Sequence, residues 1–165
     1  METIFIRRIN DVKKSKLELE RKLNVKIKIL ENKVTVIGDT LEEYDAIKVF
    51  DAIQFGFSIK KSLLLKQEDF IFRKIHVRDH TKRNLRDIQS RLIGKNGKTK
   101  RIISEISGCE ILIKEGEVGI VGYFEDVENT STALISLIKG SKQSNMYKYL
   151  EKMNKRNDAF DLGLR

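Results

Sequence analysis

The order of apolar and polar positions along the chain repeats once. The shift that carries Gly56 onto Gly140 also lays Val34-Thr35-Val36-Ile37 over Val118-Gly119-Ile120-Val121. We call it the repeat shift, and it needs no gap from about residue 9 to residue 56. A match of this length predicts two copies of one supersecondary unit.

Each copy predicts the same elements. In the second copy, Ile102, Ile103 and Ile106 lie on one face of a helix over residues 98–107, and residues 17–23 take its place in the first copy. Two short strands rich in Ile and Val follow, joined by tight turns at Glu31-Asn32-Lys33 and Glu115-Gly116-Glu117. Each copy closes with an amphipathic helix, whose apolar line is Ile47, Phe50, Ile53 and Phe57 in the first copy and Val127, Leu134, Leu137 and Ile138 in the second.

The second copy has two further elements in front. Residues 70–77 predict a strand, and Leu85, Ile88 and Leu92, at spacing i, i+3, i+7, predict a helix. Its order is therefore strand–helix–helix–strand–strand–helix. The first copy begins so close to Met1 that Thr3 to Ile6 supply a strand but the first helix is missing or stunted.

We therefore predict an α+β chain with two tandem units, each a three-stranded antiparallel sheet packed against helices. The first, truncated unit covers residues 1–57 and the second covers residues 70–165. Residues 58–69 form a connecting helix through Leu63-Leu64-Leu65, with Ser58 as its N-cap.

Charge is concentrated in one stretch. The chain of 165 residues has a formal net charge of +9. Between Phe70 and Arg101 only Asp79 and Asp87 are acidic, so that this stretch alone accounts for the whole excess. Its eleven basic residues are Arg73, Lys74, Arg78, Lys82, Arg83, Arg86, Arg91, Lys95, Lys98, Lys100 and Arg101. Such a cluster fits a polyanionic partner, and a solvated basic face without a partner is the alternative.

Composition excludes several classes of protein. No apolar run approaches the ~18 residues of a membrane span, and the N-terminus does not have the pattern of a signal peptide. The single cysteine, Cys109, excludes an internal disulfide and a multi-cysteine metal site. We expect a soluble, cytoplasmic protein without a membrane partner.

The most informative segment is Gly94-Lys95-Asn96-Gly97, a Gly-x-x-Gly turn between two predicted helices inside the basic cluster. Glycine permits the backbone angles that end a helix, and it lacks a Cβ that would keep another backbone away. The N–H groups at the start of the second helix then point at whatever lies on the turn. The arrangement predicts a clamp for a sugar-phosphate backbone.

The element order and this turn resemble a K-homology (KH) domain of the eukaryotic-type (type I) topology, whose Gly-x-x-Gly loop clamps about four nucleotides of a single strand. Residues 92–100, Leu-Ile-Gly-Lys-Asn-Gly-Lys-Thr-Lys, resemble more narrowly the KH-domain small-ribosomal-subunit assembly factors, in their archaeal form. The likeness extends over roughly residues 20 to 155.

The resemblance implies an RNA-binding ribosome assembly factor that binds single-stranded rRNA near the 3′ end of small-subunit rRNA during pre-rRNA processing. Implied protein partners are the rRNA 3′-end maturation endonuclease and the alpha subunit of initiation factor two. The expected RNA-binding residues are Arg91, Ile93, Gly94, Lys95, Asn96, Gly97, Lys98, Lys100, Arg101 and Ile111. Ile93, Ile103 and Ile111 or Ile113 would line an apolar groove for bases, and for each of them a plain core position is the alternative.

The first copy departs from this pattern. The repeat shift places Asn10 and Lys13 where the second copy has Gly94 and Gly97. A Cβ at both positions and an acid between them, Asp11, argue against a phosphate clamp there. We therefore interpret this copy as degenerate, a packing or protein-contact module.

Other chemistry finds little support. His76 and His80 have a spacing that could hold a metal, but solvated side chains explain them more simply. No nucleotide, metal or hydrolase motif is present, so we expect no cofactor and no enzyme activity. Two alternatives stay open: a tandem KH protein of RNA decay or regulation, and an interaction scaffold for which RNA binding is secondary.

Overall fold

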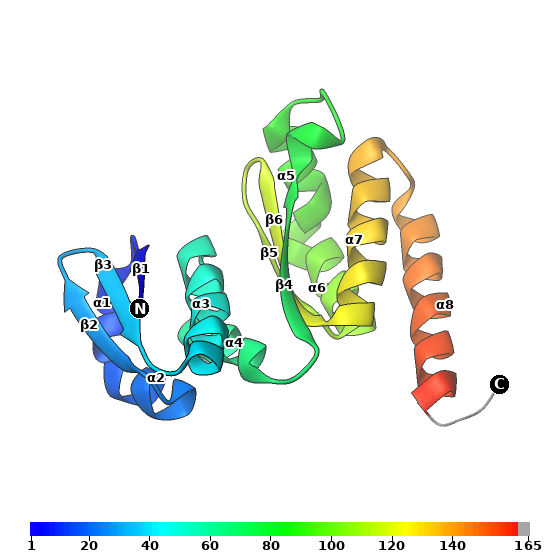
Figure 1. Ribbon diagram of the computed structural model, residues 1–165. Helices are drawn as coiled ribbons and strands as arrows, with labels where there is room; N and C mark the ends of the chain where they lie inside the picture. The colour runs from blue at the N-terminus through cyan, green and yellow to red at the C-terminus, as the bar shows by residue number, and fades with distance from the viewer. Residues whose placement is uncertain (162–165) are drawn as a thin grey trace. The chain divides into compact units, whose positions relative to one another are not determined.

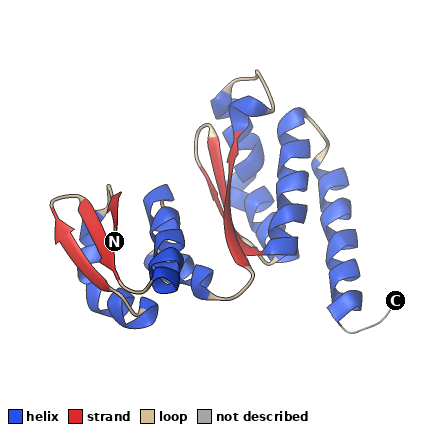
Figure 2. Cartoon of the chain, viewed as in Figure 1, coloured by secondary structure: helices blue, strands red, loops and turns tan. Residues whose placement is uncertain are grey.

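The computed structural model describes the backbone of residues 1–161 and the side-chain environment up to residue 156. The chain divides into two compact units, which we call unit 1 (Met1–Phe70) and unit 2 (from Ile71 onward). Each unit holds one three-stranded sheet with helices alongside it (Figure 2). The predicted α+β class with two antiparallel sheets is confirmed.

Unit 1 has a short version of the predicted order. Its strands are β1 (Glu2–Phe5), β2 (Lys26–Leu30) and β3 (Lys33–Ile37), paired antiparallel in the order β1-β3-β2. Its helices are α1 (Ile9–Lys14), α2 (Lys16–Leu23), α3 (Thr40–Phe55) and the single turn α4 (Ile59–Ser62). The predicted first helix is therefore present but stunted.

The apolar alternation of the strands fixes which face is covered. Ile27, Val34 and Val36 are buried, and Val49 and Phe50 are buried on α3, the helix that contacts β3. Because consecutive side chains of a strand point to opposite faces, the polar residues between these positions point away from the core.

Two predictions for unit 1 need correction. Asn10 and Lys13 do not form the counterpart of the Gly-x-x-Gly turn, because both lie inside α1. Ile9 and Val12 are buried at helical spacing, so packing holds this segment in a helix. The predicted helix through Leu63-Leu64-Leu65 is a 3-10 turn, Leu63–Lys66, that follows α4. Ser58 is the N-cap of α4, and its hydroxyl accepts from the Lys61 N–H at 3.2 Å.

Unit 2 has the full order. Its strands β4 (Phe70–His76), β5 (Glu110–Ile113) and β6 (Glu117–Tyr123) form the sheet β4-β6-β5. Its helices are α5 (Leu85–Ile93), α6 (Lys98–Ser107), α7 (Phe124–Lys139) and α8 (Gln143–Asp161). The repeat shift carries β2, β3 and α3 of unit 1 onto β5, β6 and α7, as predicted.

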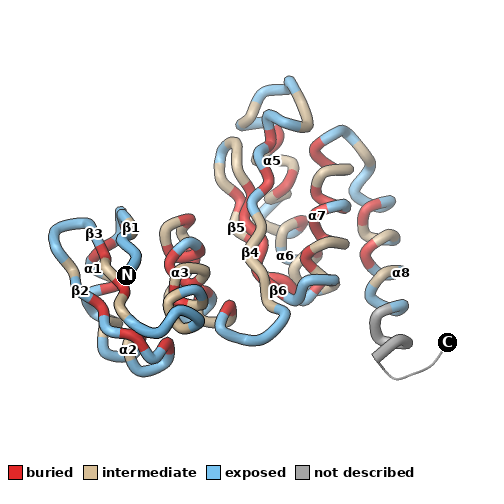
Figure 3. The backbone as a smooth tube through the Cα atoms, in the orientation of Figure 1, coloured by how far each residue is buried: buried red, intermediate tan, exposed pale blue. Residues whose placement is uncertain are grey.

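The C-terminal helix belongs to the packed body of unit 2. α8 lies beside α7 and also contacts α6 (Figure 1). Figure 3 colours parts of α7 and of the described length of α8 as buried. Met146 and Leu150 of α8 belong to the core cluster with Leu134 and Leu137 of α7. Within residues 1–161, no helix is long and apolar enough to span a membrane.

Candidate nucleic-acid interface

The loop at Gly94–Gly97 begins where α5 ends. Asn84 caps this helix, and its Oδ1 accepts from the N–H groups of Arg86 at 2.9 Å and Asp87 at 3.3 Å. The last turn closes when the Gly94 N–H donates to the Ser90 carbonyl at 2.8 Å. Gly94 then takes φ +76° and ψ 174°, which directs the chain out of the helix.

The turn itself is compact. The Gly97 N–H donates to the Gly94 carbonyl at 3.2 Å, and Asn96 and Gly97 both have positive φ, at 56° and 73°. Asparagine and glycine are the residues that adopt this region most readily. Gly97 is the N-cap of α6 and has no side chain, so no side-chain oxygen caps the first turn of that helix. The positive end of α6 therefore has no side-chain cap.

The two glycines meet different constraints. A Cβ on Gly94 would lie 2.2 Å from Oγ1 and 2.8 Å from the backbone N of Thr99, whereas a Cβ on Gly97 would meet no atom within 4 Å. Thr99 is itself buried, and its hydroxyl accepts from the Gln143 side-chain amide at 3.2 Å. Gly94 is therefore required for close packing inside the loop, and Gly97 leaves the outer side of the loop open.

Most of the predicted polar residues gather around this turn. Lys95, Asn96, Lys98 and Arg101 are exposed, and Lys100 is half-buried. Arg91 is placed differently: its guanidinium donates to the Ser141 carbonyl, and its Nε is buried without a partner. The loop thus presents Lys95, Asn96 and Lys98 to solvent, while Arg91 ties α5 to the segment that precedes α8.

The predicted apolar groove is mostly core. Ile103 is fully buried, Ile111 is 4 % exposed and Ile113 is 8 % exposed, and all three belong to the core cluster of unit 2. Ile93 packs against the same cluster but stays partly open to solvent. Of the four positions, Ile93 is the one that a base could reach without a rearrangement of the core.

The sequence pattern did not reveal the part of α8 in this site. Gln143 donates a hydrogen bond to Thr99, and the Ser141 carbonyl accepts one from Arg91. In the chain, both residues are separated from the loop by β5, β6 and α7. Neither residue stands in an apolar period. Only the burial of Met146 and Leu150 at helical spacing would have placed this segment beside α6.

Metal binding and thiol chemistry lack a site in the described part of the chain. His76 Nδ1 lies 3.4 Å from a carboxylate oxygen of Glu117, and nowhere among the described residues do three His, Cys, Asp or Glu side chains gather as ligands. Cys109 is a buried core residue next to Thr130. Burial raises the pKa of its thiol, which keeps it protonated at neutral pH.

We expect Cys109 to resist thiol reagents in the folded protein. Its reaction with an aromatic disulfide at pH 8 should be at least about 100-fold slower than that of the urea-unfolded chain, because the thiol is both buried and protonated. Absorbance of the released thiolate measures both rates. Equal rates would show that Cys109, the residue before β5, is not held in the core.

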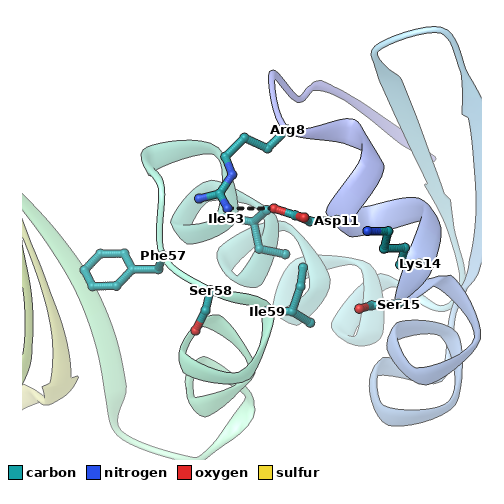
Figure 4. A pocket seen from close by; sticks show the side chains of 8 residues that line it. All are labelled: Arg8, Asp11, Lys14, Ser15, Ile53, Phe57, Ser58 and Ile59. Carbon is teal, nitrogen blue, oxygen red and sulfur yellow. Dashed lines mark ion pairs between the residues drawn. The ribbon is translucent and has the colours of Figure 1, made fainter.

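At the α1–α2 junction of unit 1, a single residue, Ser15, stands where unit 2 has its loop. A cavity of about 290 Å³ opens there, and Figure 4 shows its lining. Arg8 and Asp11, at its rim, pair with each other at 2.9 Å. The apolar residues that line it are Ile53, Phe57 and Ile59. No glycine pair stands at this junction, so that unit 1 has no counterpart of the loop.

Comparison with known protein families and relatives supports the same topology. The family described as the eukaryotic-type KH domain (KH-domain type I) matches residues 71–155. A KH domain-containing protein of Methanocaldococcus jannaschii is 29% identical over 157 residues, a match that covers 90% of this chain and 68% of that protein. The pre-rRNA-processing protein PNO1 of Debaryomyces hansenii is 30% identical over 139 residues, which cover 79% of this chain and 53% of that protein. The chain spans about half the length of such fungal relatives.

Two solved structures from Pyrococcus horikoshii OT3 have the same fold over nearly the whole chain. One is Dim2p, with a TM-score of 0.83 and 29% identity, covering 92% of this chain and 98% of that one. The other is Dim2p in a complex with a/eIF2alpha and rRNA, with a TM-score of 0.84 and 28% identity, covering 94% of each chain.

Proposed function

The chain belongs to the eukaryotic-type KH-domain family (KH-domain type I), and from this membership we propose that it is an RNA-binding ribosome assembly factor. The relatives named as pre-rRNA-processing proteins and the Dim2p–rRNA complex agree with the resemblance inferred from residues 92–100. The observation that carries the proposal is the Gly94–Gly97 loop, with its open glycine, uncapped helix start and exposed lysines.

The loop would bind the phosphates of a single strand. Backbone N–H groups at the start of α6 donate to phosphate oxygens, and Lys95, Lys98 and Lys100 supply positive charge beside them. Arg101 would reach the strand from the next turn of α6, and Ile93 would contact a base. Arg91 and Ile111 act within the protein in this proposal, since one is tied to Ser141 and the other is buried.

The proposed substrate is single-stranded rRNA near the 3′ end of the small-subunit rRNA. The neighbour solved with rRNA and a/eIF2alpha supports rRNA and the initiation factor alpha subunit as partners. The rRNA 3′-end maturation endonuclease and a cytoplasmic location remain predictions from the resemblance. Binding of this kind requires no catalytic group, and we propose that the protein is not an enzyme.

We propose different roles for the two copies of the repeat. The RNA is held by the loop of the second unit, which covers residues 70–165. The first unit, residues 1–57, is a degenerate KH unit without a Gly-x-x-Gly turn, and residues 58–69 connect the two units. A role in RNA decay or regulation would use the same loop on other RNAs. Crosslinking to total RNA distinguishes an assembly factor from a protein of RNA decay or regulation. The crosslinks of an assembly factor should fall in one region of rRNA.

Changing Lys95 and Asn96 together to Asp should abolish loop binding. The variant loses one phosphate contact and places two negative charges on the turn, so that affinity for a fragment of the rRNA 3′ end should fall about 100-fold. With about three to four phosphates neutralised, the wild-type log–log salt slope should be about −2 to −3. Fluorescence anisotropy measures both quantities.

The matched control is Lys152→Asp with Asn154→Asp, the same two substitutions at exposed positions of α8. It should keep most of the affinity, because the net charge change is equal but lies away from the loop. Circular dichroism should show both variants folded. An unchanged affinity of the Lys95/Asn96 variant would overturn the assignment of the loop.

A further inference from the structure

The sheet of unit 1 turns one face away from its own core. The register places Phe5, Lys33 and Leu30 in one row across the three strands, and Thr3, Thr35 and Lys28 in the next. Lys26 and Ile37 form the third row. We call these residues the outer sheet face of unit 1: Thr3, Phe5, Lys26, Lys28, Leu30, Lys33, Thr35 and Ile37.

This face is open and basic. Each row holds one lysine, all three lysines are exposed, and none of the eight residues is acidic. Within the described residues, none of the lysines makes an ion pair. Successive rows on one face of a strand are about 6.7 Å apart, so the charges form a series along the sheet. Phe5 and Leu30, 52 % and 75 % exposed, flank Lys33 in the first row.

Two of the three lysine positions are acidic in unit 2, and the third is apolar. The repeat shift places Glu110, Leu112 and Glu117 where unit 1 has Lys26, Lys28 and Lys33. Glu117 there lies 3.4 Å from His76, inside its own unit. The fold itself therefore does not require lysines on this face, and their presence in unit 1 calls for a separate explanation.

We propose that the outer sheet face of unit 1 is a second surface for single-stranded RNA. The three lysines would bind successive phosphates, and the exposed ring of Phe5 would stack on a base. Aromatic side chains on an open sheet and a basic track are the features with which other sheet-based proteins hold single strands. The proposal rests on the proposed RNA-binding function, and it gives the unit that lacks the loop a direct role in it.

RNA fits this face better than an acidic protein segment does. The apolar side chains share a row with Lys33, so a charge and a flat apolar surface lie side by side, as the phosphate and base of one nucleotide do. The spacing of the lysines by rows matches a regular polyanion. An acidic protein partner is retained as an outcome of the test.

The test uses the full chain with Lys26, Lys28 and Lys33 all changed to Gln. Two probes are used, an unstructured single-stranded RNA of roughly 20 nucleotides and one of about five, which the loop alone can hold. Binding of the long RNA should weaken about tenfold, and its salt slope should become shallower by about 2. Binding of the short RNA should not change.

The matched control removes three exposed positive charges from the helices of unit 1, with Lys13, Arg21 and Lys60 changed to Gln. Its affinity for the long RNA should change less than about twofold. The single variant Phe5→Ala should weaken long-RNA binding about fivefold or more, as loss of a base stack does. Long RNA that contains 5-iodouridine should form a photo-adduct at Phe5, which mass spectrometry locates.

Failure of the loop assignment and failure of this proposal are distinguishable. If the Lys95/Asn96 variant leaves short-RNA binding intact, the loop assignment fails, while the effect of the sheet variant on long RNA stands by itself. Equal affinities of the sheet variant and its control would overturn the sheet proposal. A polyglutamate peptide that displaces long RNA from this face at similar concentration would overturn it in favour of an acidic protein partner.

Discussion

Replacing Gly94 by Ala should destabilise unit 2 by roughly 2–5 kcal/mol, more than any other single methyl group added to the loop. Two costs combine. The new Cβ would lie 2.2 Å from Oγ1, 2.7 Å from Cβ and 2.8 Å from the backbone N of Thr99, and φ is +76°. Thr99 is buried against α8, so neither its side chain nor its backbone can move away cheaply.

The control is Gly97→Ala in the same turn. Its φ is +73°, so it carries the same kind of backbone cost, about 1–2 kcal/mol, but a Cβ there meets nothing within 4 Å. Hydrogen exchange of the peptides that cover α5 and α6, followed through a urea series, compares the two variants locally. If Gly97→Ala were the more damaging, close packing of Thr99 would not be what demands glycine at position 94.

Leu150→Ala should destabilise unit 2 by about 2–5 kcal/mol, the range for removing a large side chain from a packed core. Leu150 is 2 % exposed and lies in the core cluster with Leu134 and Leu137 of α7. Because α8 also contacts α6, loss of this anchor should raise hydrogen exchange in α6 as well as in α8.

The comparison is Lys148→Ala, just before Leu150 on the exposed side of the same helix. Alanine is a good helix former and little is buried there, so its effect should stay within about 0.5 kcal/mol. Urea unfolding monitored by circular dichroism gives both values. Similar values for the two variants would contradict a structural role for α8.

The sequence predicted the repeat because both copies have buried apolar residues at the same positions. β2, β3 and α3 fall on β5, β6 and α7 after the repeat shift, since buried apolar positions leave a strong period in sheet and helix alike. The shift failed at Asn10 and Lys13. There the helix is held by Ile9 and Val12, and a junction of one residue replaces a whole loop, so equal spacing no longer means equal structure.

The sequence predicted only those parts of the candidate site whose residues lie close together in the chain. The glycine spacing and the lysines lie within a few residues, and the structure keeps them together. The roles of Arg91 and Gln143 depend on contacts between segments far apart in the chain, which no local pattern encodes. Ile111 is a core residue rather than a groove residue. The alternation of a strand predicts that such a residue is buried, but it does not show whether a ligand can reach it.

The burial of Thr99 beneath Gly94 has a consequence for kinetics. A loop held by packing on its inner side has little conformational freedom left to lose when a ligand arrives, so ordering costs a small part of the interaction free energy. Encounter should then be governed by diffusion and the lysine field, with fast, salt-sensitive association. Differences in affinity among RNA sequences should consequently lie in the dissociation rates of the complexes.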